Sequence, residues 1–97
     1  MDGPHERARL LIQEYLKESL GRISFWQGYS FAQTSYAKWA ATELLKCLDE
    51  KQTTPPLIVI EEFRDKMNRF SCMNRNTSYV FSVAYDMAGD IIDQLLT

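Results

Sequence analysis

Apolar residues recur at spacings of three and four over almost the whole chain. This spacing places them on one side of a helix with 3.6 residues per turn, whereas a strand would require alternation. The pattern predicts an all-α fold, a compact bundle of about four helices with short connections, covering about 4–20, 30–51, 56–72 and 77–96. No repeat or compositional boundary interrupts it, so we expect residues 1–97 to form a single helical domain.

Proline and glycine mark the ends of these expected helices. Pro4 suits a first helical turn, and Gly21 is expected to end the first helix. The consecutive prolines Pro55 and Pro56 end the second helix and begin the third. The aliphatic run 57–60 that follows is assigned to the third helix, because a lone strand would have no partner with which to pair.

The same periodicity identifies the side chains that we expect the helices to bury. In the first helix they are Ala8, Leu11, Ile12, Tyr15, Leu16 and Leu20. In the third, the seam spacing of a bundle selects Ile60, Phe63, Met67 and Phe70. In the last, the apolar face consists of Val80, Val83, Ala84, Met87, Ile91 and Leu95. Gly89 interrupts this last helix at a cost of about 1 kcal/mol relative to alanine, which indicates close approach by a neighbouring helix.

The charge balance bears on partners and on cellular location. Eleven basic residues are outnumbered by thirteen acidic ones, for a net charge of −2, which argues against a protein that coats nucleic acid. The amino terminus lacks the apolar stretch of a signal peptide, and no apolar run approaches the ~20 residues of a membrane-spanning helix. We therefore expect a cytoplasmic protein without a membrane segment, in which Cys47 and Cys72 are reduced.

The residue types needed for catalysis are not found in any suggestive arrangement. There is no glycine-rich phosphate loop and no nucleophile elbow, and the single histidine, His5, is expected near a mobile terminus. Asp86, Asp90 and Asp93 share one face of the last helix, but carboxylate metal sites in bundles draw on two helices and include histidines. We interpret the aspartates as a solvated face and expect no enzyme, no cofactor and no metal.

Aromatic residues are concentrated in one part of the chain, with six in the fifteen positions from 25 to 39. Such rings can fill the core where a loop lies over a bundle, or they can act in binding hot spots, where tryptophan and tyrosine are favoured. A bundle of this size is expected to leave one or two of the six exposed. A second apolar candidate is the edge formed by Leu57 and Ile58 beside the seam. The sequence therefore predicts a protein–protein interaction module that binds another protein or a second copy of itself as a homodimer. The expected partner-binding residues are Phe25, Trp26, Tyr29, Phe31, Trp39, Leu57 and Ile58.

Small size, reduced cysteines and an acidic helical composition resemble accessory proteins of bacteria, phages and mobile elements. This resemblance is compositional, and it implies an accessory protein or an inhibitor that binds a larger protein. The alternative is a small DNA-binding regulator, in which Asn74, Arg75 and Asn76 contact DNA from the start of a recognition helix. The three aspartates farther along that helix would repel phosphate, so nucleic acid is the less favoured partner.

Overall fold

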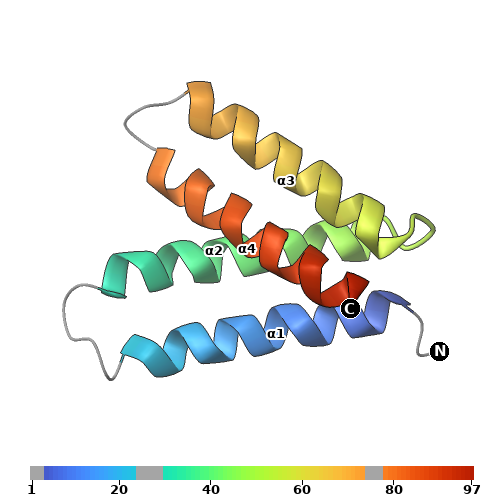
Figure 1. Ribbon diagram of the computed structural model, residues 1–97, viewed down its shortest axis with the longest axis horizontal. Coiled ribbons are helices and arrows are strands. Elements are labelled where there is room, and N and C mark those ends of the chain that lie inside the picture. Colours follow the sequence, from blue (N-terminus) through green and yellow to red (C-terminus); the bar gives the residue numbers. More distant parts are fainter. Residues whose placement is uncertain (1–3, 24–29, 74–77) are drawn as a thin grey trace.

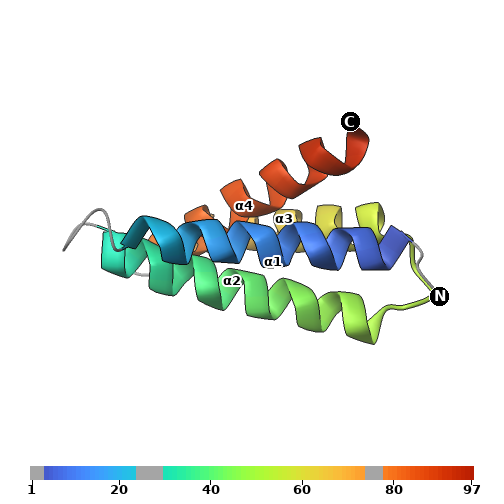
Figure 2. The same ribbon diagram turned by 90° about the horizontal axis from the view of Figure 1, so that it is seen from below.

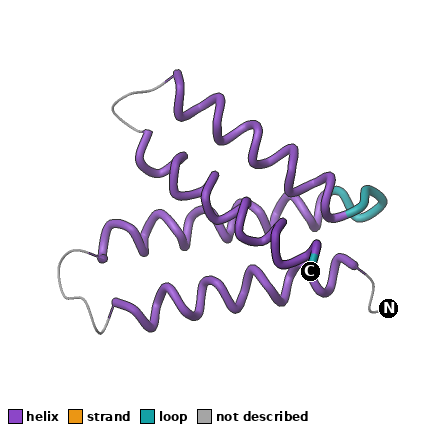
Figure 3. Tube along the Cα trace, viewed as in Figure 1, coloured by secondary structure: helices purple, strands orange, loops and turns teal. Residues whose placement is uncertain are grey.

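The computed structural model describes residues 4–23, 30–73 and 78–97, with the backbone alone at 4, 18–23, 30–34, 73 and 78–79. These residues form four helices: α1 (Pro4–Ile23), α2 (Ser30–Glu50), α3 (Pro56–Met73) and α4 (Ser78–Leu96). Within the described ranges there is no strand, as Figure 3 shows. The predicted all-α bundle of four helices is confirmed.

The helices are arranged as two antiparallel hairpins, α1 with α2 and α3 with α4 (Figure 1). The contact of α3 with α4 is the most extensive, and α4 also packs against α2. Helices α2 and α3 meet near the connection between them and diverge away from it. Figure 2 shows the carboxyl end of α4 and the helix α2 on opposite sides of the molecule. The candidate functional site lies between α2 and α3.

The proline signals are confirmed, and the glycine signal is wrong. Helices α1 and α3 begin at Pro4 and Pro56. The amides of residues 58 and 59 donate to the carbonyl of Pro55 at 3.1 and 3.2 Å, which caps α3. Helix α1 does not stop before Gly21 but continues to Ile23. Glycine adopts helical as well as left-handed dihedrals, and each residue added to an existing helix gains a hydrogen bond.

One cluster of buried side chains draws on all four helices. Its members are Ala8, Ile12, Ala40, Ala41, Leu44, Leu48, Val59, Ile60, Phe63, Met67, Ala84, Met87, Ala88, Ile91 and Ile92. Burying one of the larger aliphatic side chains fully stabilises the fold by about 1.5–3 kcal/mol. The predicted seam on α3 is buried at Ile60, Phe63 and Met67, whereas Phe70 is only half-buried against the core.

The first turn of α1 is tied to the connection between α2 and α3. His5 Nε2 donates a hydrogen bond to the carbonyl oxygen of Thr54 at 2.6 Å. Arg9, one turn farther along, forms an ion pair with Asp49 near the end of α2. The expectation that His5 lies near a mobile terminus is therefore wrong, because its ring is anchored by a partner 49 positions away.

Gly89 accommodates a side chain from the neighbouring helix. A Cβ atom at this position would lie 2.9 Å from Nη2 of Arg64, which belongs to α3. The guanidinium of Arg64 rests over the ring of Tyr85, 4.2 Å from its centroid. The predicted close approach to Gly89 is thus made by an arginine side chain that crosses from α3 to α4.

Candidate functional site

The structure describes only part of the predicted binding set. Phe25, Trp26, Tyr29, Asn74, Arg75 and Asn76 lie outside the described residues, and Phe31 is described by its backbone alone. Trp39, Leu57 and Ile58 are described in full. The roles assigned to the other residues, and the DNA-binding alternative that depends on residues 74–76, stay predictions.

Trp39 belongs to an aromatic cluster that also contains Phe70 and Phe81, so that α2, α3 and α4 contribute one ring each. The rings of Trp39 and Phe81 meet edge to face, with centroids 6.0 Å apart and an angle of 72° between their planes. The rings of Phe81 and Phe70 are 5.2 Å apart. Such pairs contribute about 0.5–1.5 kcal/mol beyond simple burial and orient the rings. Trp39 is thus held by the fold although 38% of its surface remains exposed.

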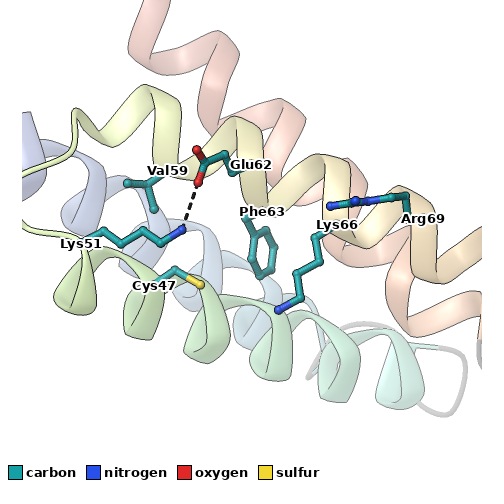
Figure 4. A pocket seen from close by; sticks show the side chains of 7 residues that line it. All are labelled: Cys47, Lys51, Val59, Glu62, Phe63, Lys66 and Arg69. Atoms are coloured by element: carbon teal, nitrogen blue, oxygen red, sulfur yellow. Dashed lines mark hydrogen bonds and ion pairs between the residues drawn. The ribbon is translucent and has the colours of Figure 1, made fainter.

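A groove with a volume of about 270 Å³ lies between α2 and α3 (Figure 4). The residues that line this α2–α3 groove are Cys47, Lys51, Val59, Glu62, Phe63, Lys66 and Arg69. Val59 and Phe63 are almost completely buried and form its apolar floor. The charged side chains and the thiol surround that floor, so the groove combines an apolar base with a polar rim.

Lys66 joins the groove to the aromatic cluster. Its side chain lines the groove and extends from α3 toward α2 (Figure 4). Its Nζ atom also lies 5.7 Å from the centroid of the Phe70 ring. On α2, Trp39 and Cys47 are eight residues apart, about two helical turns, with Glu43 midway between them. Lys66 therefore borders both the α2–α3 groove and the aromatic cluster.

The groove is positively charged. At the end near the α2–α3 connection, Lys51 Nζ lies 3.0 Å from a carboxylate oxygen of Glu62. The hydrogen bond to Glu62 and the charge of this carboxylate raise the pKa of Lys51. Lys66 and Arg69 take part in none of the ion pairs formed by the described residues. Three cations and one carboxylate leave the groove with a charge of +2, in a chain whose net charge is −2.

Cys47 places a thiol on the wall of the groove. Burial raises the pKa of this thiol, and the ammonium group of Lys66 opposes that rise only in part. The thiol is therefore protonated near neutral pH and is a weak nucleophile, because the thiolate is the reactive form. The second cysteine, Cys72, is exposed near the end of α3 and does not line the groove. Cys47 can act as a soft contact surface for a bound group.

The predicted apolar edge lies apart from this surface. Leu57 is partly buried against the core, and Ile58 is 44% exposed. Ile58 is in the first turn of α3, twelve residues before Phe70, which corresponds to about 18 Å along the helix. The structure therefore does not bring the edge at Leu57 and Ile58 together with the aromatic cluster.

The acidic strip of α4 is solvated. Asp86, Asp90 and Asp93 are all exposed, and no ion pair between described residues includes them. Of the arginines on the neighbouring helix α3, Arg64 lies over Tyr85 and Arg69 lines the groove. In the described ranges, no group of three or more histidine, cysteine or acidic side chains is arranged to hold a metal ion.

Comparisons with known proteins give no significant match to a family model, a curated protein or a solved structure. None of the helices in the described part of the chain is both long and apolar enough to cross a bilayer. The case for a function therefore depends on the geometry of the aromatic cluster and the α2–α3 groove.

Of the residues on this surface, Trp39 alone is among the partner-binding residues expected from the sequence. Phe70 was expected in the core, and no role in binding was expected for Lys66 or Arg69. A signal exists in the spacing, since Trp39 and Cys47 of α2 and Lys51, just beyond its end, are separated by multiples of four. That repeat becomes informative only when α2 is known to face positions 62, 66 and 69 of α3.

Proposed function

We propose that this protein is a small, non-enzymatic protein–protein interaction module that binds a larger protein through the aromatic cluster and the α2–α3 groove. The observation that carries the proposal is that Trp39 remains 38% exposed although Phe81 holds its ring edge to face. Tryptophan is among the residues most enriched in binding hot spots. A ring that is already oriented loses little conformational freedom when a partner covers it, so more of its burial contributes to affinity.

The surroundings of Trp39 support the same proposal. Arginine and aromatic side chains are enriched in protein interfaces, and here Lys66 borders both the groove lined by Arg69 and the cluster that contains Phe70 and Trp39. The groove volume of about 270 Å³ is below the range of about 300–1,000 Å³ typical of small-molecule pockets. A space of this size favours a partner's side chains over a drug-sized ligand.

The proposal includes accessory and inhibitor proteins of bacterial, phage or mobile-element systems. A small domain with a binding surface of this kind can act by covering a functional site on a larger protein. A homodimer would use the same surface with a second copy as the partner. Cytoplasmic location belongs to the proposal as well. It is supported by Cys47 and Cys72, which are both free thiols, as is usual in a reducing compartment.

The proposal is tested by quantitative capture of partners with the wild-type protein as bait in an extract of its source organism. The test variant is Trp39→Ala. The matched control is Leu10→Ala, which removes another exposed apolar side chain, 51% exposed, from α1. We expect a protein that is enriched by the wild type and by Leu10→Ala and lost with Trp39→Ala. Circular dichroism confirms that all three baits are equally helical.

Light scattering of the purified protein over a range of concentrations identifies the homodimer. A dimer that becomes a monomer in Trp39→Ala, but not in Leu10→Ala, makes a second copy the partner. If Trp39→Ala captures the same proteins as the wild type and also forms the same oligomer, the proposed surface is not the interface.

A further inference from the structure

We propose that the segment of the partner protein that occupies the α2–α3 groove is an acidic amphipathic helix. Its carboxylates would face Lys66 and Arg69, and its apolar side chains would cover the groove floor and the ring of Trp39. This inference rests on the proposed function and adds the chemistry of the partner to it.

The charges of the groove select an acidic occupant. Lys66 and Arg69 are three residues apart on α3, about 4.5 Å along the helix axis, and neither is in an ion pair with a described residue. Carboxylates three or four residues apart on a second helix have a matching separation. Lys51 is already paired with Glu62, so it closes one end of the groove and leaves two cations for the partner. A basic helix would be repelled by the same pair, which adds specificity.

The apolar floor of the groove favours an amphipathic helix over an acidic helix that has no apolar face. Val59 and Phe63 are 1% and 4% exposed, and the protonated thiol of Cys47 adjoins them. From Trp39 to Cys47 the aromatic cluster and the groove extend over eight residues of α2, about 12 Å or two helical turns, and Lys51 lies just beyond the end of α2. A helix of that length presents apolar side chains along one stripe, with room for acidic residues on both sides.

A polynucleotide satisfies the cations and leaves the apolar floor unused. Non-specific binding to phosphates also depends on the number of cations that contact them, and this groove offers two that form no ion pair with a described residue. Nucleic acid is therefore the competing outcome of the experiment.

The two cysteines provide a direct measurement of groove occupancy. Cys47 lines the groove, whereas Cys72 is exposed outside it. The rate at which a maleimide labels Cys47 therefore measures whether the groove is occupied, and the rate at Cys72 is the internal control. The probe is a synthetic helix of about 18 residues, five turns, composed of Glu, Leu and Ala, with Leu along one face and Glu beside it. We expect this peptide to slow the labelling of Cys47 at least fivefold and to leave the rate at Cys72 unchanged.

Two charge-reversal variants distinguish an effect of the groove charges from an effect of the net charge of the protein. In Lys66→Glu/Arg69→Glu the protection of Cys47 should disappear. In Lys17→Glu/Lys46→Glu, which makes the same change in net charge at exposed positions outside the groove, the protection should remain. Each variant is compared with and without peptide, because Lys66 itself influences the pKa of Cys47. A peptide with Lys in place of Glu should give no protection.

Three results would overturn the inference: no protection up to millimolar acidic peptide, equal protection by the lysine peptide, or stronger protection by a short DNA duplex. The proposed function can fail separately. Capture of a partner through Trp39 without protection by the acidic peptide keeps the interaction module and rejects the acidic helix. If Trp39→Ala also leaves capture and oligomeric state unchanged, both are rejected.

Discussion

The guanidinium of Arg64 lies 4.2 Å above the centre of the Tyr85 ring, and this stack links α3 to α4. Arginine stacks well because its planar group is weakly hydrated, which suits a partly buried position. The Nε atom of Arg64 is buried without a hydrogen-bond partner among the described residues, and the guanidinium interacts with the Tyr85 ring as a cation with a π system. Gly89, four residues beyond Tyr85, leaves the space that the guanidinium fills.

The first prediction concerns this glycine. Gly89→Ala places a Cβ 2.9 Å from Nη2, so the flexible end of Arg64 must move off Tyr85. The loss of the stack, about 0.5–1 kcal/mol, offsets most of the gain of about 1 kcal/mol in helix propensity. We expect little change in the free energy of unfolding, measured with urea. In an Arg64→Ala background the same substitution should stabilise the protein by about 1 kcal/mol. Equal effects in both backgrounds would show that the guanidinium does not respond to position 89.

The second prediction ranks two members of the aromatic cluster. Phe81 contacts both other rings and is half-buried, whereas Trp39 contacts Phe81 at one edge and is 38% exposed. We expect Phe81→Ala to lower the free energy of unfolding by about 2–3 kcal/mol, somewhat less than a fully buried phenylalanine, and Trp39→Ala by about 1 kcal/mol. Denaturant unfolding measures both. A larger loss for Trp39→Ala would mean that Trp39 belongs to the core and not to a binding surface.

The third prediction concerns the thiols. Near neutral pH a maleimide should label Cys72, which is exposed, before Cys47, whose pKa is raised from 9.0 by burial. Lys66→Met should slow Cys47 further, because it removes the cation that favours the thiolate. Peptide mapping of the labelled protein over time measures both rates. Faster labelling of Cys47 than of Cys72 at pH 7 would contradict the raised pKa.

The same raised pKa makes a fourth prediction about stability and pH. Above pH 9.0 the unfolded chain releases the Cys47 proton while the folded chain still holds it, so the unfolded state binds fewer protons. The contribution of Cys47 is therefore fully present below this pH and is lost as pH rises toward its folded pKa. Thermal melts from pH 8 to 10 should fall more steeply for the wild type than for Cys47→Ala. Parallel curves would mean that the thiol has the same pKa in both states.

The fifth prediction tests the anchor of α1. His5→Ala removes the hydrogen bond from Nε2 to the carbonyl of Thr54 and should cost about 1 kcal/mol of unfolding free energy. Gln13→Ala, at an exposed position on the same helix, is the control and should change stability by less than about 0.5 kcal/mol. Indistinguishable urea midpoints for the two variants would show that the terminus of α1 is not held by His5.

Local patterns predicted most of the secondary structure. Three helix starts are correct or displaced by one residue at most: those read from Pro4 and Pro56, and the last one, expected at about 77 and found at Ser78. The one clear error, at Gly21, arose because glycine permits a helix end without requiring one. Residues 24–29, between the first two expected helices, lie outside the described residues.

The sequence by itself determined which positions are helical and which face of each helix is apolar, because both depend on spacing within a few residues. Only the tertiary structure decided what the faces meet. It brings Trp39 to Phe81, sets Arg64 over Tyr85, and places Lys66 between the aromatic cluster and the groove. These contacts depend on the angle at which α2 and α3 diverge and on the packing of α4. Such angles are set by the fit of many side chains at once, which no local spacing encodes.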